Sequence, residues 1–321
     1  MTLNHRFSTA KASPTMSFAA RRSAHPDPIN LAIGEPDASP PPEAIAAAVA
    51  CLESNGARYG PALGISELRT EIAKQQSETA GVEWSTDEVA VTCGGKQALA
   101  ETFRVLLNPG DEVLVLAPYW PSFLDQVERA GGVPVVVPAL SDLRPSLAAA
   151  EELLSKRTQA VVINDPSNPS SICWRSEEKL ALAQLAREKE LWLIADQVYD
   201  ALRFDPDHTP LLSLAPDLKD QTVVVTSFSK SFAMTGYRVG AALAPSAVIE
   251  ALGSVIGATT THTAMPSQCA ALAALSSDSS VALDLVRASR AKVEVAMKDR
   301  EELKTCGVSL PTPEAAFYLF P

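Results

Sequence analysis

The sequence lacks the spacings that mark a disulfide framework or a zinc site. Its 321 residues include an odd, widely spaced set of five cysteines without a C-x-x-C pair, namely Cys51, Cys93, Cys173, Cys269 and Cys306. The four histidines are isolated, and none has the partner four residues away that a helical metal site needs. We therefore expect no metal centre and a reducing compartment such as the cytoplasm.

Long hydrophobic runs and excess positive charge are also missing. Charge-free apolar runs such as residues 44–52 have about half the length of a bilayer span. Lys and Arg total 27 against 38 Asp and Glu, and the net charge of −11 leaves no basic field for a nucleic-acid backbone. With 46% hydrophobic residues, the chain has the apolar mass for a folded core, which excludes disorder as its main state.

The first 26 residues contain no acidic side chain but carry several basic ones, including His5, Arg6, Lys11, Arg21 and Arg22. Their setting among Ser, Thr and Ala is typical of an organelle transit peptide. An N-terminal arm that lies on the body or on a partner subunit can have the same composition. No secretory hydrophobic region is present, so the cytoplasm is the expected location.

Apolar runs of strand length alternate with helical patterns between about residues 42 and 260. The predicted strands are Glu88–Thr92, Glu112–Ala117, Val133–Val137, Ala160–Ile163, Leu191–Ala195 and Thr222–Thr226. The predicted helices include Glu43–Ser54, Gln97–Leu107, Trp120–Ala130, Leu147–Ser155 and Ser176–Lys189. This rhythm predicts an α/β fold with a mostly parallel sheet covered on both faces. A long helix over Val281–Thr305 and a strand over Ala315–Phe320 are predicted to follow.

Polar residues follow several predicted strands, at the edge of the sheet where ligands bind in such folds. Gly94, Gly95 and Lys96 open a helix whose free N–H groups favour an anion such as phosphate. A Gly-Gly turn also serves tight packing of a helix on a strand. Asp196 ends a buried strand, and Tyr199 follows three residues later. That carboxylate either has a functional partner or caps the next turn, and both interpretations stay open.

A lysine follows the predicted strand Thr222–Thr226. A desolvated amine at the position of Lys230 has a lowered pKa and suits a Schiff base, whereas a surface lysine is the ordinary alternative. The hydroxyls of Ser227 and Ser229 are small donors that fit phosphate oxygens. The guanidinium of Arg238 can grip a phosphate with two hydrogen bonds.

An amide and an indole complete the set. Asn168 precedes Pro169 and either donates to a phenolate-like oxygen or only forms an Asn-Pro turn. Trp120 either stacks on a planar ring or fills the core. Together with the amine, the carboxylate and the anion site, these groups meet the needs of pyridoxal phosphate: an aldehyde, a ring nitrogen, a ring face, a 3-oxygen and a phosphate.

These residues stand in motifs that run in order along nearly the whole chain, at residues 32–37, 58–69, 94–99, 118–120, 168–169, 196–199, 227–230, 236–240 and 316–318. On these motifs the chain resembles the class I/II aminotransferases, the fold-type I pyridoxal-phosphate family that includes bacterial aspartate aminotransferases. The resemblance implies a three-layer α/β/α large domain and a smaller α+β domain. It also favours the N-terminal arm over the transit peptide.

The resemblance implies a role for each catalytic residue. Lys230 would carry the cofactor as a Schiff base and move the proton at the substrate Cα. Asp196 would pair with the pyridine nitrogen and keep it protonated. Tyr199 and Asn168 would bond the 3-oxygen of the ring, and Trp120 would stack on the ring face.

Further residues would bind the rest of the cofactor and the substrate. The phosphate would be held by Gly94, Gly95, Lys96, Ser227, Ser229 and Arg238. Substrate contacts would come from Gly34, Trp120 and Asn168. The tyrosine matching Tyr59 reaches the phosphate of the neighbouring subunit in this family, which implies a homodimer with shared active sites.

The expected domain limits follow the same resemblance. Residues 1–38 would form the N-terminal arm and part of the small domain, residues 39–278 the large cofactor-binding domain, and residues 279–321 the beginning of the small domain. Family members continue for several tens of residues past the stretch matching residues 314–318, and that part carries an arginine for the substrate α-carboxylate. The small domain is therefore expected to be truncated here.

The predicted function is transfer of an amino group from an L-amino acid, with aspartate favoured, to a 2-oxo acid such as 2-oxoglutarate. Lys96 matches a lysine that can reach the distal carboxylate of acidic substrates, although it can equally support the phosphate. A β-lyase on the same fold and a truncated cofactor-binding protein with little activity are the alternatives. The cofactor residues alone do not separate them.

Overall fold

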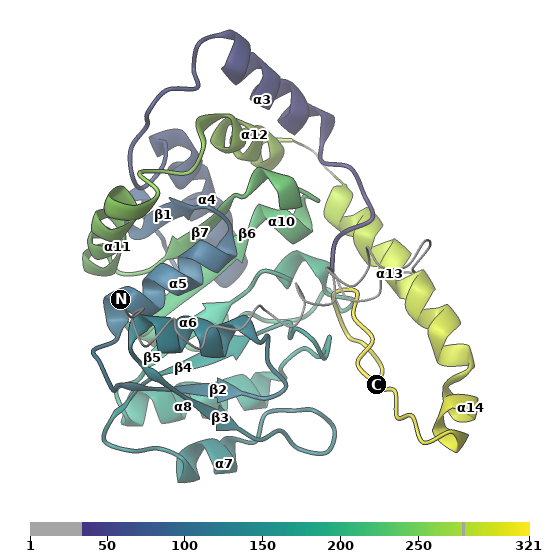
Figure 1. Cartoon of the computed structure of the whole chain (residues 1–321). Helices are drawn as coiled ribbons and strands as arrows, with labels where there is room; N and C mark the ends of the chain where they lie inside the picture. Colours follow the sequence, from purple (N-terminus) through teal and green to yellow (C-terminus); the bar gives the residue numbers. More distant parts are fainter. Residues whose placement is uncertain (1–33, 278–279) are drawn as a thin grey trace, which may run out of the picture.

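The structure is a computed structural model that describes residues 34–277 and 280–321. Its centre is a seven-stranded sheet with the order β1-β7-β6-β5-β4-β2-β3. The strands are β1 (Val89–Thr92), β2 (Glu112–Leu116), β3 (Val133–Val137), β4 (Thr158–Asn164), β5 (Trp192–Asp196), β6 (Thr222–Ser227) and β7 (Gly240–Leu243). Neighbouring strands are parallel except that β7 is antiparallel to both β1 and β6. The predicted mostly parallel sheet is confirmed (Figure 1).

Helices surround this sheet. They are α3 (Pro42–Glu53), α4 (Ser66–Ala80), α5 (Gly95–Leu106), α6 (Ser122–Ala130), α7 (Leu147–Glu152), α8 (Ser176–Glu188), α9 (Leu211–Leu214), α10 (Phe228–Ser231), α11 (Ser246–Thr259), α12 (Met265–Leu275), α13 (Val281–Lys298) and α14 (Arg300–Thr305). Short 3-10 turns lie between them, at η1 (Thr86–Glu88), η2 (Asp200–Leu202), η3 (Pro216–Gln221) and η4 (Thr235–Tyr237).

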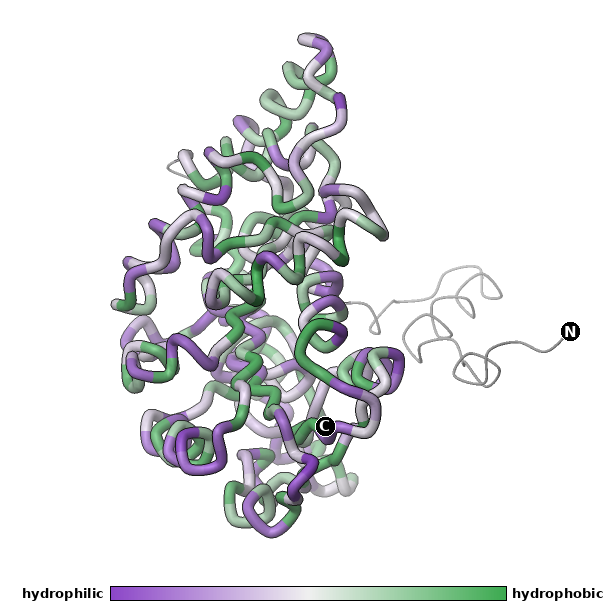
Figure 2. The backbone as a smooth tube through the Cα atoms, turned by 90° about the vertical axis from the view of Figure 1, so that its left-hand side faces the viewer, coloured by the Kyte–Doolittle hydropathy of each residue, from purple (hydrophilic) through white to green (hydrophobic). Residues whose placement is uncertain are grey.

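The sheet separates two hydrophobic cores because side chains alternate along each strand. Along β4, Val161 and Ile163 pack in the core shared with α4, α8 and α12. Ala160 and Val162 face the other core, shared with α5, α6 and α11. Both faces of β4 are therefore buried, as expected for a central parallel strand. Figure 2 shows the green, apolar stretches of backbone running through the middle of the molecule.

Strand β7 was not identified from the sequence. Its residues, Gly-Ala-Ala-Leu, have little β-propensity, and the strand forms because it is enclosed between β1 and β6. A Cβ built on Gly240 would lie 2.5 Å from the backbone nitrogen of Gly95. Glycine at position 240 therefore lets β7 approach the start of α5 closely.

Two expectations for the C-terminal part are wrong. The long helix is interrupted at Asp299, where α13 ends and α14 begins, and Asp is among the weaker helix formers. Residues 315–320 do not form a strand. Ala315 makes an isolated bridge to Arg203, and Ala316 has φ +55°, which turns the chain out of the extended conformation.

The expected domain limits stay a prediction. Residues 1–33, with the N-terminal arm or transit peptide, and the boundary at residues 278–279 lie outside the described residues. Helices α13 and α14 lie beside the sheet layers, on the side where the C-terminus returns to the body (Figure 1). In the described part of the chain, no helix has both the length and the apolar character to cross a membrane.

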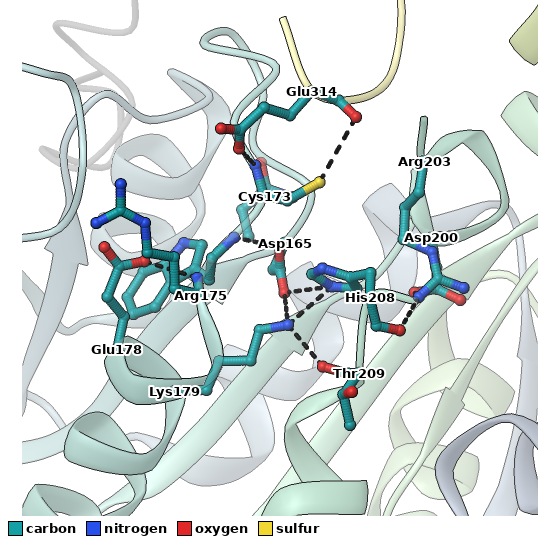
Figure 3. A network of polar contacts seen from close by, with 12 residues as sticks. Asp165, Cys173, Arg175, Glu178, Lys179, Asp200, Arg203, His208, Thr209 and Glu314 are labelled. Carbon is teal, nitrogen blue, oxygen red and sulfur yellow. Dashed lines mark hydrogen bonds and ion pairs between the residues drawn. The ribbon is translucent and has the colours of Figure 1, made fainter. Parts of the chain in front are cut away.

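A buried ionic cluster joins three segments at the carboxyl end of β4 (Figure 3). The ammonium of Lys179 lies 2.7 Å from Asp165 Oδ2 and donates to the carbonyl oxygen of Thr209. The Nε2 atom of His208 lies 3.0 Å from the same carboxylate oxygen. Burial alone would raise the pKa of Asp165, but the hydrogen bond from His208 and the charge of Lys179 outweigh it and hold that pKa below its usual value.

The same cluster contains three possible metal-ligand atoms within 4.8 Å of one another, on Asp165, Cys173 and His208. The Lys179 nitrogen lies 2.8 Å from His208 Nε2 and 2.7 Å from Asp165 Oδ2. An ammonium therefore already occupies the place between two of these ligands and supplies the positive charge there. The cluster acts as an internal ion pair.

Because this ion pair is buried, we expect removal of one partner to lower the free energy of unfolding strongly. In Lys179→Met, the buried carboxylate of Asp165 loses its ammonium, and the free energy of unfolding should fall by about 3–5 kcal/mol. The double variant Asp165→Asn/Lys179→Met removes both charges and should recover a large part of the loss. Urea unfolding of the three proteins measures this, and equal losses in the single and double variants would contradict the assignment.

Candidate active site

A cleft of about 930 Å³ opens at the edge of the sheet where the parallel strands end. It is lined by residues from seven separate stretches of the chain. Most of the predicted site residues line it, namely Gly34, Gly95, Lys96, Trp120, Asn168, Asp196, Tyr199, Ser227, Ser229, Lys230 and Arg238. Gly94 lies directly beside this set, whereas Tyr59 does not reach the cleft.

Asp196 lies in the cleft at the last position of β5. It is 5% exposed, and its Oδ1 atom accepts a hydrogen bond of 3.2 Å from the backbone N–H of Val198. Burial raises the pKa of Asp196 to about 7. Among the described residues, no cationic side chain forms an ion pair with this carboxylate. A buried acid in this state is poised to pair with a positively charged group that enters the cleft.

Lys230 lies in α10, the short helix that follows β6 without a loop. Its ammonium donates a hydrogen bond to the carbonyl oxygen of Gly34 and lies 5.6 Å from the ring centre of Phe317. Burial lowers the pKa of Lys230 to about 8, with the charge of Arg238 acting in the same direction and that of Glu35 against it. A larger fraction of this amine is therefore neutral, and nucleophilic, near pH 7 than for an exposed lysine.

A candidate anion site lies at the N-terminus of the 12-residue helix α5. Gly94 has φ +78°, and a Cβ there would lie 2.6 Å from Nη2 of Arg238. The guanidinium of Arg238 therefore rests directly on the Gly94 backbone and donates to the carbonyl oxygens of Thr235 and Cys93. Backbone N–H groups at a helix start and a neighbouring guanidinium together bind phosphate well.

Two serines and a lysine complete the rim of this anion site. The Ser227 hydroxyl donates to the carbonyl oxygen of Val239 and accepts from the backbone N–H of Ser229. Lys96 lies in the first turn of α5, with Nζ 4.8 Å from the ring centre of Trp120. Burial, helped by the charge of Arg238, lowers the pKa of Lys96.

Two phenols and an amide also line the cleft. Asn168 Nδ2 lies 3.4 Å from the hydroxyl of Tyr199, and its backbone N–H donates to Asn164 Oδ1. The Tyr199 hydroxyl also makes a hydrogen bond with the hydroxyl of Tyr318. Burial raises the pKa of Tyr199 well above its ordinary value, so the phenol stays protonated. Tyr318 was not predicted as a site residue, although it stands in a stretch that carries the family resemblance.

Tyr59 is separate from these residues. Its side chain is 90% exposed, and its ring meets the ring of His262 edge-on at a centroid distance of 6.0 Å. A phenol so exposed on one chain is free to contact another molecule. The predicted contact of Tyr59 with a neighbouring subunit stays a prediction.

The geometry and the motifs are matched by known proteins. The sequence profile described as aminotransferase class I and II matches residues 26–321. The chain belongs to this family. It is 37% identical to the aspartate aminotransferase of Thermotoga maritima, over 99% of this chain and 84% of the relative. It is 36% identical to a probable aspartate/prephenate aminotransferase of Thermus aquaticus, again over 99% and 84% of the two chains.

Solved structures agree with the sequence relatives. The Thermus thermophilus aspartate aminotransferase with maleate superposes with a TM-score of 0.92 at 34% identity and covers 99% of this chain and 84% of that one. The Thermotoga maritima aspartate aminotransferase superposes with a TM-score of 0.90 at 36% identity, over 98% and 84% of the chains. The predicted fold-type I architecture and the predicted aminotransferase activity are confirmed.

The side chains in the cleft fit pyridoxal phosphate, the cofactor that the sequence predicts. The buried carboxylate of Asp196 lacks a cation among the described residues, which suits a protonated ring nitrogen. The amine of Lys230 has a lowered pKa, which suits bonding to an aldehyde. The anion site formed by Gly94, Gly95 and Arg238 suits a phosphate. Each end of the cofactor thus has a matching group in the same cleft.

Because the carboxylate of Asp196 has no cationic partner among the described residues, we expect the stability of the protein without cofactor to depend on pH. Because the pKa of Asp196 is about 7 in the folded chain and near 4 when unfolded, stability should fall as the pH rises through this interval. In Asp196→Asn this loss is absent. The variant should match the parent near pH 4 and exceed it by about 2–4 kcal/mol near pH 8. Urea unfolding of both apoproteins tests this, and parallel pH curves would refute it.

Proposed function

We propose that this chain binds pyridoxal 5′-phosphate in the cleft and moves an amino group from an L-amino acid, aspartate foremost, to a 2-oxo acid such as 2-oxoglutarate. The observation that carries the proposal is the convergence of Asp196, Lys230 and the Arg238 anion site on one cleft. The family membership supports the same conclusion, because these groups occupy the positions that the resemblance assigns to cofactor binding.

When bound, the cofactor supplies an electron-withdrawing ring that accepts the electron pair released as the substrate Cα–H bond breaks. Asp196 holds the proton on the ring nitrogen, since its burial makes pairing with a cation favourable. Lys230 would hold the cofactor through its amine and would take the proton from the substrate Cα, a role that its lowered pKa suits. Tyr199 and Asn168 line the cleft where they would bond the ring oxygen, and Trp120 would cover one face of the ring.

The phosphate end is held by the anion site. The backbone N–H groups of Gly94 and Gly95 and the guanidinium of Arg238 provide directed donors, and the hydroxyls of Ser227 and Ser229 are close by. Lys96 adds positive charge on the same side. Holding the phosphate fixes the ring relative to Lys230, which keeps the reacting atoms in register.

The choice of aspartate rests on charge. The relatives include proteins named aspartate and aspartate/prephenate aminotransferases. In this chain, Lys96 lines the cleft and can meet a distal carboxylate, while Gly34 lines the cleft through its backbone. We propose that Lys96 recognises the side-chain carboxylate of the donor.

The assembly and location follow from two further features. The exposed phenol of Tyr59 supports a homodimer in which this side chain reaches the phosphate in the neighbouring subunit. All five cysteines are free thiols, which suits a reducing compartment such as the cytoplasm. The proposed partners are therefore an amino acid, a 2-oxo acid and a second copy of the chain.

Lys230 is expected to carry the cofactor. Borohydride reduction of the holoenzyme followed by peptide mapping should place the pyridoxyl label on Lys230, and Lys230→Ala should lose amino transfer by several orders of magnitude. Lys292→Ala is the matched control, because its side chain is 69% exposed. Formation of glutamate from 2-oxoglutarate measures the activity. A label on another lysine would overturn the assignment of Lys230, and release of ammonia without any need for 2-oxoglutarate would instead favour the β-lyase.

Lys96 is expected to set the preference for an acidic donor. Lys96→Met keeps much of the length of the side chain but removes its charge, so kcat/KM for aspartate should fall about tenfold or more relative to alanine, the factor that about 1.4 kcal/mol supplies. Cofactor affinity is measured in the same variant by absorbance titration. An equal loss for both donors with weaker cofactor binding would show that Lys96 supports the phosphate instead.

A further inference from the structure

The final segment of the described chain is attached to the loop that follows β4. The carbonyl oxygen of Ser171 accepts from the backbone N–H groups of Glu314 and Ala315, and its hydroxyl accepts from the backbone N–H of Tyr318 at 3.2 Å. Ser171 lies only three residues after Asn168. One serine therefore fixes the path of the C-terminal segment relative to the wall of the active site.

Ser171 adopts this position at a conformational cost. Its φ is +57°, in the left-handed region that favours glycine, and the residue is fully buried. Glycine would avoid the cost but has no hydroxyl. The backbone conformation at position 171 does not need a side chain. The Ser171 hydroxyl is instead used to accept the hydrogen bond from the backbone N–H of Tyr318.

The carboxylate of Glu314 anchors the same segment. Its Oε1 atom receives a hydrogen bond of 2.7 Å from Arg144, and its Oε2 atom receives one of 2.8 Å from the backbone N–H of Cys173. Figure 3 shows Glu314 lying beside Cys173, at the edge of the ionic cluster around Asp165. The segment that carries Tyr318 is therefore held at its start by a charge pair and at its end by the Ser171 hydroxyl.

Tyr318 contacts two parts of the active site at once. Its hydroxyl is hydrogen-bonded to that of Tyr199. Its ring packs so closely against Gly34 that a Cβ on this glycine would lie 2.6 Å from Tyr318 Cε1. Gly34 in turn accepts the hydrogen bond from Lys230. Tyr318 thus lies between the phenol and the amine of the proposed cofactor site.

The number of hydrogens on these groups limits how they can bond. A phenol has one proton to donate and two lone pairs that accept. Asn168 Nδ2 can only donate to the Tyr199 oxygen, and Tyr318 can donate there too. If both donate, the single proton of Tyr199 is free for an acceptor in the cleft, and donation to a phenol oxygen makes that phenol a stronger donor.

We propose that Tyr318, held in place by the Ser171 hydroxyl, is a positioning residue that donates its proton to Tyr199 and so directs the Tyr199 proton toward the ring oxygen of the bound cofactor. The inference rests on the proposed cofactor binding. The charged groups around the pair are Asp196, on β5, whose charge acts on Tyr199, and Lys230, on α10 beside Gly34 and Phe317. Neither replaces the Tyr318 hydroxyl, because Asp196 bonds to Val198 and Lys230 to Gly34.

Tyr318→Phe removes the hydroxyl and keeps the ring. Tyr199 then donates less strongly to the ring oxygen, so this oxygen retains more negative charge and holds a proton more tightly on the neighbouring nitrogen that joins the cofactor to lysine. The pH midpoint of the visible absorbance change of the holoenzyme should rise by about 0.5–1 unit, and the cofactor Kd should rise about 3- to 10-fold. Tyr237→Phe is the matched control, because Tyr237 does not line the cleft.

Two substitutions of Ser171 separate positioning from stability. Ser171→Ala loses the hydroxyl and keeps the unfavourable left-handed backbone, so Tm should fall. Ser171→Gly loses the same hydroxyl but relieves the backbone, so Tm should stay level or rise. Both should raise the absorbance midpoint in the direction of Tyr318→Phe. In Ser171→Gly/Tyr318→Phe the midpoint should rise no further than in Tyr318→Phe alone, because the two residues act through one contact.

The outcomes distinguish this inference from the proposed function. If the parent chain gives no visible band with pyridoxal phosphate, the proposed cofactor binding fails. If the parent binds normally and Tyr318→Phe has the same midpoint and Kd as Tyr237→Phe, the positioning role of Tyr318 is wrong. If the midpoint follows Tm across the Ser171 variants, the contact only stabilises the fold and the inference is overturned.

Discussion

The burial of one carboxylate, Asp196, is the constraint on which the site depends. Its position at the end of β5 keeps water away and raises its pKa to about 7, so the charged form needs a cation that the described side chains do not supply. The buried carboxylate of Asp196 therefore destabilises the folded protein when no cation is bound. The same burial strengthens its pairing with a bound cation. The same trade of stability for function is common at active sites, where preorganised charges do not relax when the partner is absent.

The sheet topology explains how residues from separate stretches of the chain come to lie in the same cleft as Asp196. Because β4, β5 and β6 are parallel neighbours, the residues that follow them meet at one edge, which brings Asn168, Asp196 and Lys230 together. The antiparallel β7 lies between β6 and β1 and lets the start of α5 approach through Gly240. The buried ion pair between Asp165 and Lys179 joins the loop after β4 to helix α8.

Most of the sheet could be predicted from the sequence because strands buried on both faces appear as short, continuous apolar runs. Strand β7 could not be predicted, because its glycine and alanines do not form an apolar run of this kind. The strand forms because β1 and β6 enclose it in the folded sheet. The apolar run at residues 315–320 gave the opposite error. It resembles a strand, but Ala316 turns the chain, and the run forms only an isolated bridge at Ala315.

The sequence by itself determined the kinds of chemical group at the strand ends and, through ordered motifs, the family. The tertiary structure alone decided which of these groups touch. The hydroxyls of Tyr199 and Tyr318 lie 119 residues apart along the chain and meet only because the segment around Glu314 returns to Ser171. Such contacts depend on the paths of helices and loops between the partners. Local sequence patterns report on neighbours within a few residues and carry no information about those paths.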